Sequence, residues 1–144
     1  MAPCLISLGS SMNDGLRYTL LVMGTPYSRQ ASHSALRFGE ALLASNHRLE
    51  GVFFYHDGVY NAARMMTPPQ DEPRLASRWQ ALADASGARL MVCVASALKR
   101  GLLDAREAER HGVQGDSLAP GFELAGLGQL VHATAITDRT LTFA

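Results

Sequence analysis

The sequence has little cysteine: Cys4 and Cys93 are the only thiols among its 144 residues. Two cysteines are too few for the disulfide framework of a small secreted domain, and there is no C-x-x-C pair to hold zinc. Scarce, unpaired cysteine is typical of proteins in a reducing compartment. We therefore expect a cytoplasmic protein with no metal site.

Excess charge and long apolar runs are also lacking. Lys plus Arg number 13 and Asp plus Glu number 13, so the formal net charge at pH 7 is zero. A neutral chain makes no long-range basic field, which argues against direct binding of nucleic acid. No apolar stretch approaches the ~20 residues that cross a bilayer. The first 15 residues also lack the basic start and the apolar core of a signal peptide. We expect no membrane contact.

Apolar runs alternate with helical patterns along the chain. The run YTLLVMG (18–24) is continuous and ends at a glycine, as buried parallel strands do. Further strands are expected at 49–55, 88–94, 121–126 and 139–143, and helices at 30–46, 95–101, 105–111 and 127–135. Asp71 and Glu72 are expected to lead into one more helix, which runs through Leu75, Trp79 and Leu82 and closes at Gly87. This order predicts the α/β class, as a flavodoxin-like three-layer sandwich with a mostly parallel five-stranded sheet.

Three of the expected strands end in unusual residues: Gly24-Thr25, Tyr55-His56-Asp57 and Cys93. The segment HDG (56–58) is expected to be a simple turn. In open parallel sheets the chemistry lies beyond the carboxyl ends of the strands, near the point where the strand order reverses. We therefore expect these residues to share one crevice.

Cys93 has two interpretations. In LMVCVA it alternates with apolar neighbours, and free cysteine often packs as a small buried hydrophobe. At a strand end, however, it faces the first turn of the next helix, where free N–H groups and the helix dipole favour a nucleophilic thiolate. Lys99 and Arg100 either add positive potential or point to solvent. The residues alone leave both interpretations open.

Other candidate sites are weaker. Five histidines show no metal-ligand spacing and are interpreted as surface or cap residues: His33, His47, His56, His111 and His132. His56 and Asp57 could support acid–base chemistry, but a polar turn explains them more simply. Ser34 lacks the G-x-S-x-G motif of hydrolases, and neither GTPYS (24–28) nor GLG (126–128) completes a nucleotide-binding loop. No cofactor is therefore expected.

Five segments in order resemble the DsrE/TusD sulfurtransferase family. They are VFFYHDGVYNA (52–62), TPPQDE (67–72), VCVASALKRG (92–101), DAREAERHG (104–112) and FELAGLGQL (122–130). The similarity runs from about Tyr18 to Phe143. It implies a flavodoxin-like fold and a persulfide-carrying cysteine, which falls on Cys93, with no metal and no cofactor.

The resemblance also implies partners. The chain would be one subunit of a hetero-hexamer with related small subunits, either TusB/TusC-like or DsrF/DsrH-like. It would take sulfur from a TusA-like carrier and pass it to a TusE-like or DsrC-like acceptor. In the TusD branch the sulfur ends as the 2-thio group of a tRNA wobble uridine, which is the role we expect here. The alternatives are a DsrE-like role in dissimilatory sulfur metabolism and a non-catalytic scaffold subunit, with a flavin or nucleotide binder last.

Residues 1–15 show no periodicity, whereas family members begin almost at the first strand. We expect this segment to be a disordered extension or to precede a true start near Leu16. Residues 16–144 then form one DsrE-like domain, and Cys4 takes no part in the mechanism.

Overall fold

The computed structural model describes residues 15–144. Five strands form one sheet in the order β4-β3-β2-β1-β5, and each neighbouring pair is parallel. The strands are Arg17–Val22 (β1), Arg48–Phe54 (β2), Arg89–Cys93 (β3), Phe122–Ala125 (β4) and Arg139–Phe143 (β5). The sheet is thus parallel throughout, where the sequence predicted a mostly parallel one.

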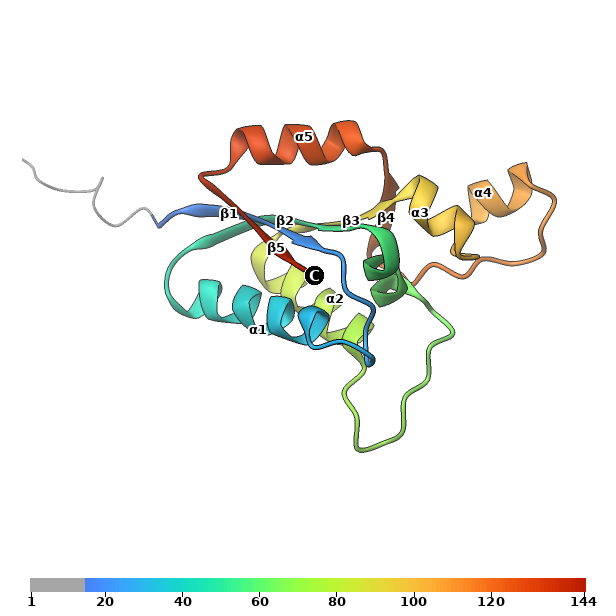
Figure 1. Ribbon diagram of the computed structural model, residues 1–144, viewed down its shortest axis with the longest axis horizontal. Coiled ribbons are helices and arrows are strands. Elements are labelled where there is room, and N and C mark those ends of the chain that lie inside the picture. The colour runs from blue at the N-terminus through green and yellow to red at the C-terminus, as the bar shows by residue number, and fades with distance from the viewer. Residues whose placement is uncertain (1–14) are drawn as a thin grey trace, which may run out of the picture.

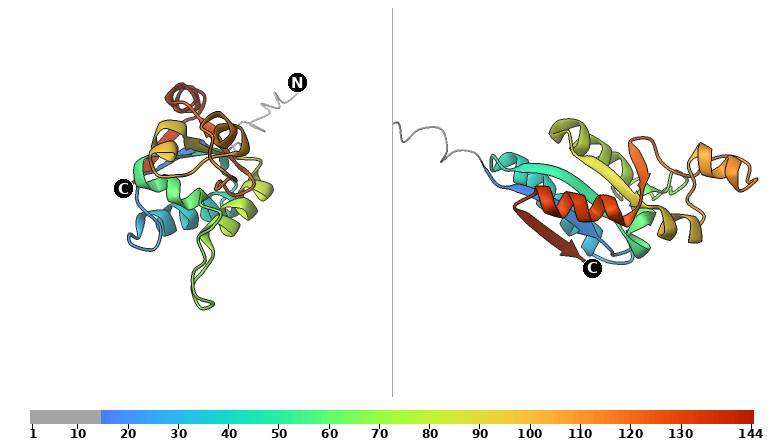
Figure 2. Two further views of the ribbon diagram at one scale, coloured as in Figure 1. Left: turned by 90° about the vertical axis from the view of Figure 1, so that its right-hand side faces the viewer. Right: turned by 90° about the horizontal axis from the view of Figure 1, so that it is seen from above.

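Helices cover both faces of this sheet, which makes three layers. The helices are Ala31–Ala44 (α1), Leu75–Ser86 (α2), Val94–Lys99 (α3), Ala105–Arg110 (α4) and Leu127–Ile136 (α5). Figure 1 shows α1 and α2 below the sheet and α5 above it, while α3 and α4 extend from one end. Seen from above in Figure 2, α5 crosses over the strands. The predicted α/β three-layer sandwich is confirmed.

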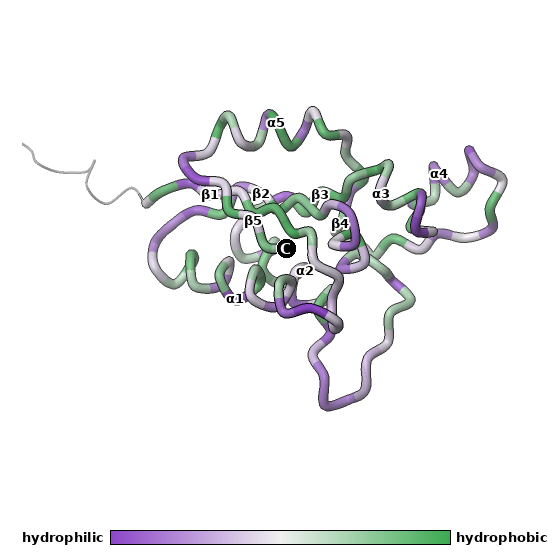
Figure 3. Tube along the Cα trace, in the orientation of Figure 1, coloured by the Kyte–Doolittle hydropathy of each residue, from purple (hydrophilic) through white to green (hydrophobic). Residues whose placement is uncertain are grey.

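The core lies mainly between the sheet and the α1–α2 layer. Leu20, Val52 and Phe54 are fully buried there, because paired residues of parallel strands face the same side. Trp79 of α2 packs edge-on against Phe54, with ring centroids 5.2 Å apart. The tube in Figure 3 is mostly green along the strands and purple at the tip of the 63–74 loop, so the loop leaves the core. This packing fixes the strand ends that the site needs.

The prediction of a simple turn at residues 56–58 is wrong, because the segment is longer and helical. These residues begin a 3-10 helix, His56–Ala62 (η2), that continues for seven residues. Asn61 stabilises it by donating from Nδ2 to the Gly58 carbonyl oxygen (2.9 Å) and to Ser32 Oγ of α1 (2.8 Å). The second contact joins residues far apart in the chain, so the local sequence pattern did not predict the helix.

Within residues 15–144, none of the helices is long and apolar enough to cross a membrane. The segment expected to be an N-terminal extension, including Cys4, lies outside the described residues except for Gly15.

Candidate functional site

Cys93 is the last residue of β3 and directly precedes α3. Because β1, β2 and β3 are neighbours in the sheet, the three unusual strand ends lie along one edge, whereas the single crevice expected from the sequence stays a prediction. The reversal of strand order, however, lies between β1 and β5, and Cys93 is two strands away from β1. The site is therefore at the expected edge but not at the switch point.

The side chain of Cys93 belongs to the sheet face that α5 covers. Alternate residues of a strand share a face, and Arg89, two positions before Met91, donates from Nη1 to Gln129 Oε1 of α5 at 3.3 Å. Arg89, Met91 and Cys93 therefore face α5. Ala125 of β4 pairs in register with Cys93, and α5 begins two residues later with Gly126 as its N-cap. Two helices, α3 and α5, thus begin next to this cysteine.

The Cys93 side chain is almost closed off in the isolated chain, with 2% of its surface exposed. It is the N-cap residue of α3 but makes no side-chain cap hydrogen bond. A hollow of about 200 Å³ lies beside it, lined by its chain neighbour Val94, by its register partner Ala125, and by Leu124 and Gly126. Cys93 does not itself line the hollow, so a molecule in the hollow does not touch its thiol.

Charged side chains from the start of α4 line the other wall of this hollow: Asp104, Arg106 and Glu107. Asp104 caps α4, as predicted, because its Oδ1 accepts from the Glu107 N–H at 2.8 Å. Glu107 Oε2 lies 3.3 Å from His111 Nε2, without hydrogen-bond geometry. The hollow therefore has an apolar wall next to the thiol and a polar wall opposite.

Polar contacts fasten η2 to α3 beside the cysteine. The His56 N–H donates to Ser96 Oγ at 3.2 Å, and Arg100 Nε donates to Asp57 Oδ1 at 2.9 Å. His56 is held at φ 49°, an uncommon conformation for a non-glycine residue. Arg100 is thus paired with a carboxylate, and Lys99 is exposed.

Two of the histidines have separate local partners. His47 Nδ1 accepts from the Leu16 N–H at 2.9 Å, and His111 faces Glu107 as described above. In the part of the chain that the structure describes, no group of three or more His, Cys, Asp or Glu residues could hold a metal ion.

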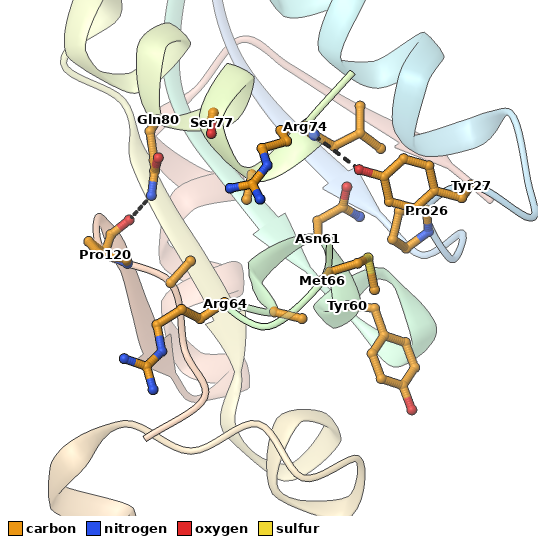
Figure 4. A pocket seen from close by; sticks show the side chains of 14 residues that line it. Pro26, Tyr27, Tyr60, Asn61, Arg64, Met66, Arg74, Ser77, Gln80 and Pro120 are labelled. Carbon is orange, nitrogen blue, oxygen red and sulfur yellow. Dashed lines mark hydrogen bonds between the residues drawn. The ribbon is translucent and has the colours of Figure 1, made fainter. Parts of the chain in front are cut away.

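Two features were missed from the sequence. The first is that the start of α5 lies next to Cys93. Gly126, at the end of the short run 121–126, is a sequence signal that indicates a helix start at this place. The second feature is a pocket on the opposite face of the sheet, between η2 and α2 (Figure 4). Its lining comes from four separate segments, so no local pattern could have indicated it.

Comparisons with known proteins identify the family. Residues 17–143 match the DsrE/DsrF-like family. Sulfurtransferase TusD of Cronobacter sakazakii is 48% identical over 128 residues, which cover 89% of this chain and all of that protein. The putative sulfurtransferase DsrE of Allochromatium vinosum is 43% identical over 89% of this chain and 98% of its own length.

A solved structure agrees on the fold. The crystal structure of the ychN protein from E. coli superposes with a TM-score of 0.67 at 20% sequence identity, over 89% of this chain and 99% of that one. At this identity the likeness supports the fold alone, whereas the relatives at 43–48% identity support the activity. The chain belongs to the DsrE/DsrF-like family, and it is a sulfurtransferase subunit of a sulfur relay.

Proposed function

We propose that Cys93 carries the sulfur as a persulfide. The observation behind this proposal is its position: it ends β3 at the carboxyl edge of the sheet, where α3 and α5 both begin. Helix starts present unpaired N–H groups and the positive end of the helix dipole, so they favour a negatively charged sulfur. The Cys93 thiolate that attacks, and that leaves again after the second transfer, is an anion of this kind.

The chemistry is an exchange between sulfur atoms. The Cys93 thiolate attacks the outer sulfur of a donor persulfide, R–S–SH, and forms a new S–S bond. The S–S bond of the donor breaks, its inner sulfur leaves as a thiolate, and the proton stays on the transferred sulfur. An acceptor thiolate then attacks the outer sulfur of Cys93–S–SH in the same way, and Cys93 leaves as the thiolate. No electrons are gained or lost overall.

The 2% exposure of Cys93 sets a condition on this mechanism. The donor and acceptor sulfurs must approach from outside, and the hollow beside Val94 and Ala125 is the nearest route. Ala95 is exposed and small, and Gly126 has no side chain, so a partner backbone can come close. We therefore expect the thiol to become reachable through this hollow when η2 or the start of α5 moves slightly.

The partners follow from the family. We propose a hetero-hexamer with TusB/TusC-like or DsrF/DsrH-like subunits, a TusA-like donor and a TusE-like or DsrC-like acceptor, in the cytoplasm. The TusD role, 2-thiolation of a tRNA wobble uridine, is favoured because relatives named TusD reach 48% identity. The DsrE relative at 43% makes the dissimilatory role the second candidate. The near-closed Cys93 supports a third, a non-catalytic scaffold subunit.

Mass spectrometry after incubation with a low-molecular-weight persulfide tests the assignment. We expect the intact protein to gain one sulfur atom, the Cys93→Ser variant to gain none, and the Cys4→Ser variant to behave as wild type. Because serine is close in size to cysteine, Cys93→Ser should remain folded and assembled. Absence of sulfur on Cys93, together with resistance to iodoacetamide in the assembled protein, would overturn the proposal and leave the scaffold role.

A further inference from the structure

The pocket between η2 and α2 is a second concave site, separate from Cys93. Its volume is about 230 Å³, and its walls come from the loop after β1, from the end of η2 and the residues after it, from the start of α2, and from Ala119 and Pro120. It lies on the α1–α2 side of the sheet, whereas Cys93 faces α5. The sulfur chemistry therefore does not explain it.

The charges that line this pocket are all positive. Arg64 and Arg74 are its only charged residues, and no Asp or Glu lines it. Arg64 is paired with Asp116 at 3.1 Å, but Arg74 has no acidic partner within residues 15–144. Figure 4 shows Arg74 extending over the pocket, between Asn61 and Ser77. In a chain with zero net charge, this local excess favours an anionic group.

The start of α2 adds to the same preference. Arg74 is the N-cap residue of this helix, with no side-chain cap hydrogen bond and no acidic residue in the first turn. The first turn, which includes Ala76 and Ser77, lines the pocket. Helices normally place an acidic or capping side chain there. Here the first turn has no acidic side chain, and the Tyr27 hydroxyl accepts from the Leu75 N–H at 3.3 Å.

The rim is apolar and exposed, which distinguishes the pocket from a site for an inorganic ion. Tyr27 is 41% exposed at its edge, Met66 lines it, and the adjacent Met65 is 74% exposed. Aromatic residues, Met and Arg are the residue types enriched in protein interfaces. Large exposed apolar side chains beside a cationic pocket fit a carboxylate that is flanked by apolar side chains.

The pocket is also held in shape before any ligand binds. Tyr27 has φ 68°, an uncommon conformation for a non-glycine residue that persists only where its surroundings enforce it. Its hydroxyl donates to the Pro73 carbonyl oxygen at 2.9 Å and accepts from the Leu75 N–H at 3.3 Å. These bonds join the loop after β1 to the start of α2 and fix the mouth of the pocket.

We propose that this pocket binds a carboxylate side chain within an apolar segment of a partner protein. The partner is assigned to the sulfur relay, and that part of the inference rests on the proposed function. The carboxylate lies against the Arg74 guanidinium and the first turn of α2, and its apolar neighbours contact Tyr27, Met65 and Met66. The first residue of η2, His56, contacts Ser96 of α3, and the end of η2 lines the pocket. A partner bound in the pocket therefore touches the same 3-10 helix that contacts α3 beside Cys93.

Peptide binding to the full chain tests the proposal. The probe is the acetylated tripeptide amide Leu-Asp-Leu, the matched control is Leu-Asn-Leu, and sodium sulfate is the small-anion control. Backbone NMR spectra are recorded during titration. We expect the Asp peptide to shift the amide signals of Asn61, Ala76 and Ser77, and to bind at least fivefold more tightly than the Asn peptide or sulfate.

Two arginine variants complete the design. Arg74→Ala should weaken the Asp peptide at least fivefold and remove its preference over the Asn peptide. Arg37→Ala removes an exposed charge from α1, outside the pocket, and should leave binding unchanged. Both side chains are exposed, so both variants should fold, which thermal unfolding checks.

Three outcomes would overturn the proposal: no binding of the Asp peptide, equal binding of both peptides, or sulfate binding as tightly as the Asp peptide. The last would indicate a site for a small oxyanion instead. None of these measurements uses a sulfur donor, and the Cys93→Ser variant should bind the peptide as wild type does. Failure of the pocket and failure of the persulfide role are therefore distinguishable.

Discussion

Ser96 is the residue that connects the sulfur site to its surroundings. Its buried Oγ accepts from the His56 N–H, and this bond joins η2 to the helix that begins after Cys93. A neutral hydrogen bond of this kind stabilises a protein by about 1 kcal/mol. The bond is therefore strong enough to hold η2 in place, and weak enough to open without unfolding the chain.

Ser96→Ala should loosen the contact between η2 and α3 beside Cys93. We expect a loss of about 1 kcal/mol in the free energy of unfolding, and faster alkylation of Cys93 by iodoacetamide. The measurement is made in a Cys4→Ser background, so that only one thiol reacts. Ser28→Ala, at an exposed position, is the control and should change neither quantity. An unchanged alkylation rate in Ser96→Ala would show that η2 does not control access.

Asn61 holds η2 against α1 and α2. Its Nδ2 donates to Ser32 Oγ and the Gly58 carbonyl oxygen, and its Oδ1 accepts from Trp79 Nε1 at 3.1 Å. With 2% of its surface exposed, Asn61 leaves its partners little access to water. Removing a buried partner costs the desolvation of each group left behind, about 1–3 kcal/mol.

Asn61→Ala should therefore lower the free energy of unfolding by roughly 2–4 kcal/mol, because Trp79 Nε1 and the Gly58 oxygen lose their partner together. Urea denaturation followed by Trp79 fluorescence measures the change. The exposed Gln114→Ala is a matched control and should stay within about 0.5 kcal/mol of wild type. If Asn61→Ala lowered the free energy of unfolding by less than about 1 kcal/mol, water would be making the hydrogen bonds that the Asn61 amide makes in the wild type.

At the scale of elements, β5 is an edge strand, and Asp138, just before it, forms a salt bridge with Arg17 at the start of β1. The Arg17 N–H at the start of β1 donates to Asp138 Oδ2 at 2.8 Å, just before β5. This hydrogen bond, and then those from the Arg17 side chain, lower the pKa of Asp138. The folded state therefore favours the ionised carboxylate. Its contribution to stability is present above the unfolded pKa of about 4 and is lost as the pH falls through the lower folded value.

Asp138→Asn should be less stable than wild type from pH 5 to 8, and the difference should shrink as the pH falls below about 4. Urea midpoints measured across this range provide the test. The effect is small because the pair is exposed to solvent and screened. Asp84→Asn, on the exposed side of α2, should show no such pH dependence. A difference that grows in acid would contradict the assignment.

Regular elements were predictable because their patterns are local. The expected strand 139–143 matches β5 at both ends, and the helix expected through Trp79 closes at Gly87 as predicted, where α2 has its C-cap with φ 74°. In contrast, η2 extends past its expected turn because Asn61 binds Ser32, which lies 29 residues earlier in the chain. No periodicity within residues 56–62 reports such a contact.

The sulfur site was predictable in part for the same reason. A cysteine at the junction of an apolar run and a helix is visible in the sequence, and Cys93 does end β3. Its 2% exposure and the nearby start of α5 depend on how β4 pairs with β3, which is set by the fold as a whole. The pocket lined by Arg74 depends on four segments and was not predictable at all.

At the scale of the whole molecule, the two sites lie on opposite faces of one sheet, and the chain as a whole is neutral. The face that α5 covers holds Cys93, and the other face holds the pocket in which Arg74 has no acidic partner within the described residues. That charge is local, and Lys plus Arg equal Asp plus Glu over the full sequence. A neutral chain of this kind makes no long-range basic field to attract a nucleic acid.

Direct binding of tRNA should then be absent from the isolated chain, even if its sulfur ends in tRNA. Binding to a nucleic acid backbone comes mainly from the release of counterions by Lys and Arg, and its affinity falls steeply with salt. A chain with zero net charge releases few of them. We expect no saturable retention of tRNA in a filter-binding assay at low salt, and no change between about 50 and 200 mM salt. Saturable binding that weakens several-fold over this range would show that the chain contacts the RNA, and an Arg74→Ala variant would then reveal whether the pocket is the contact.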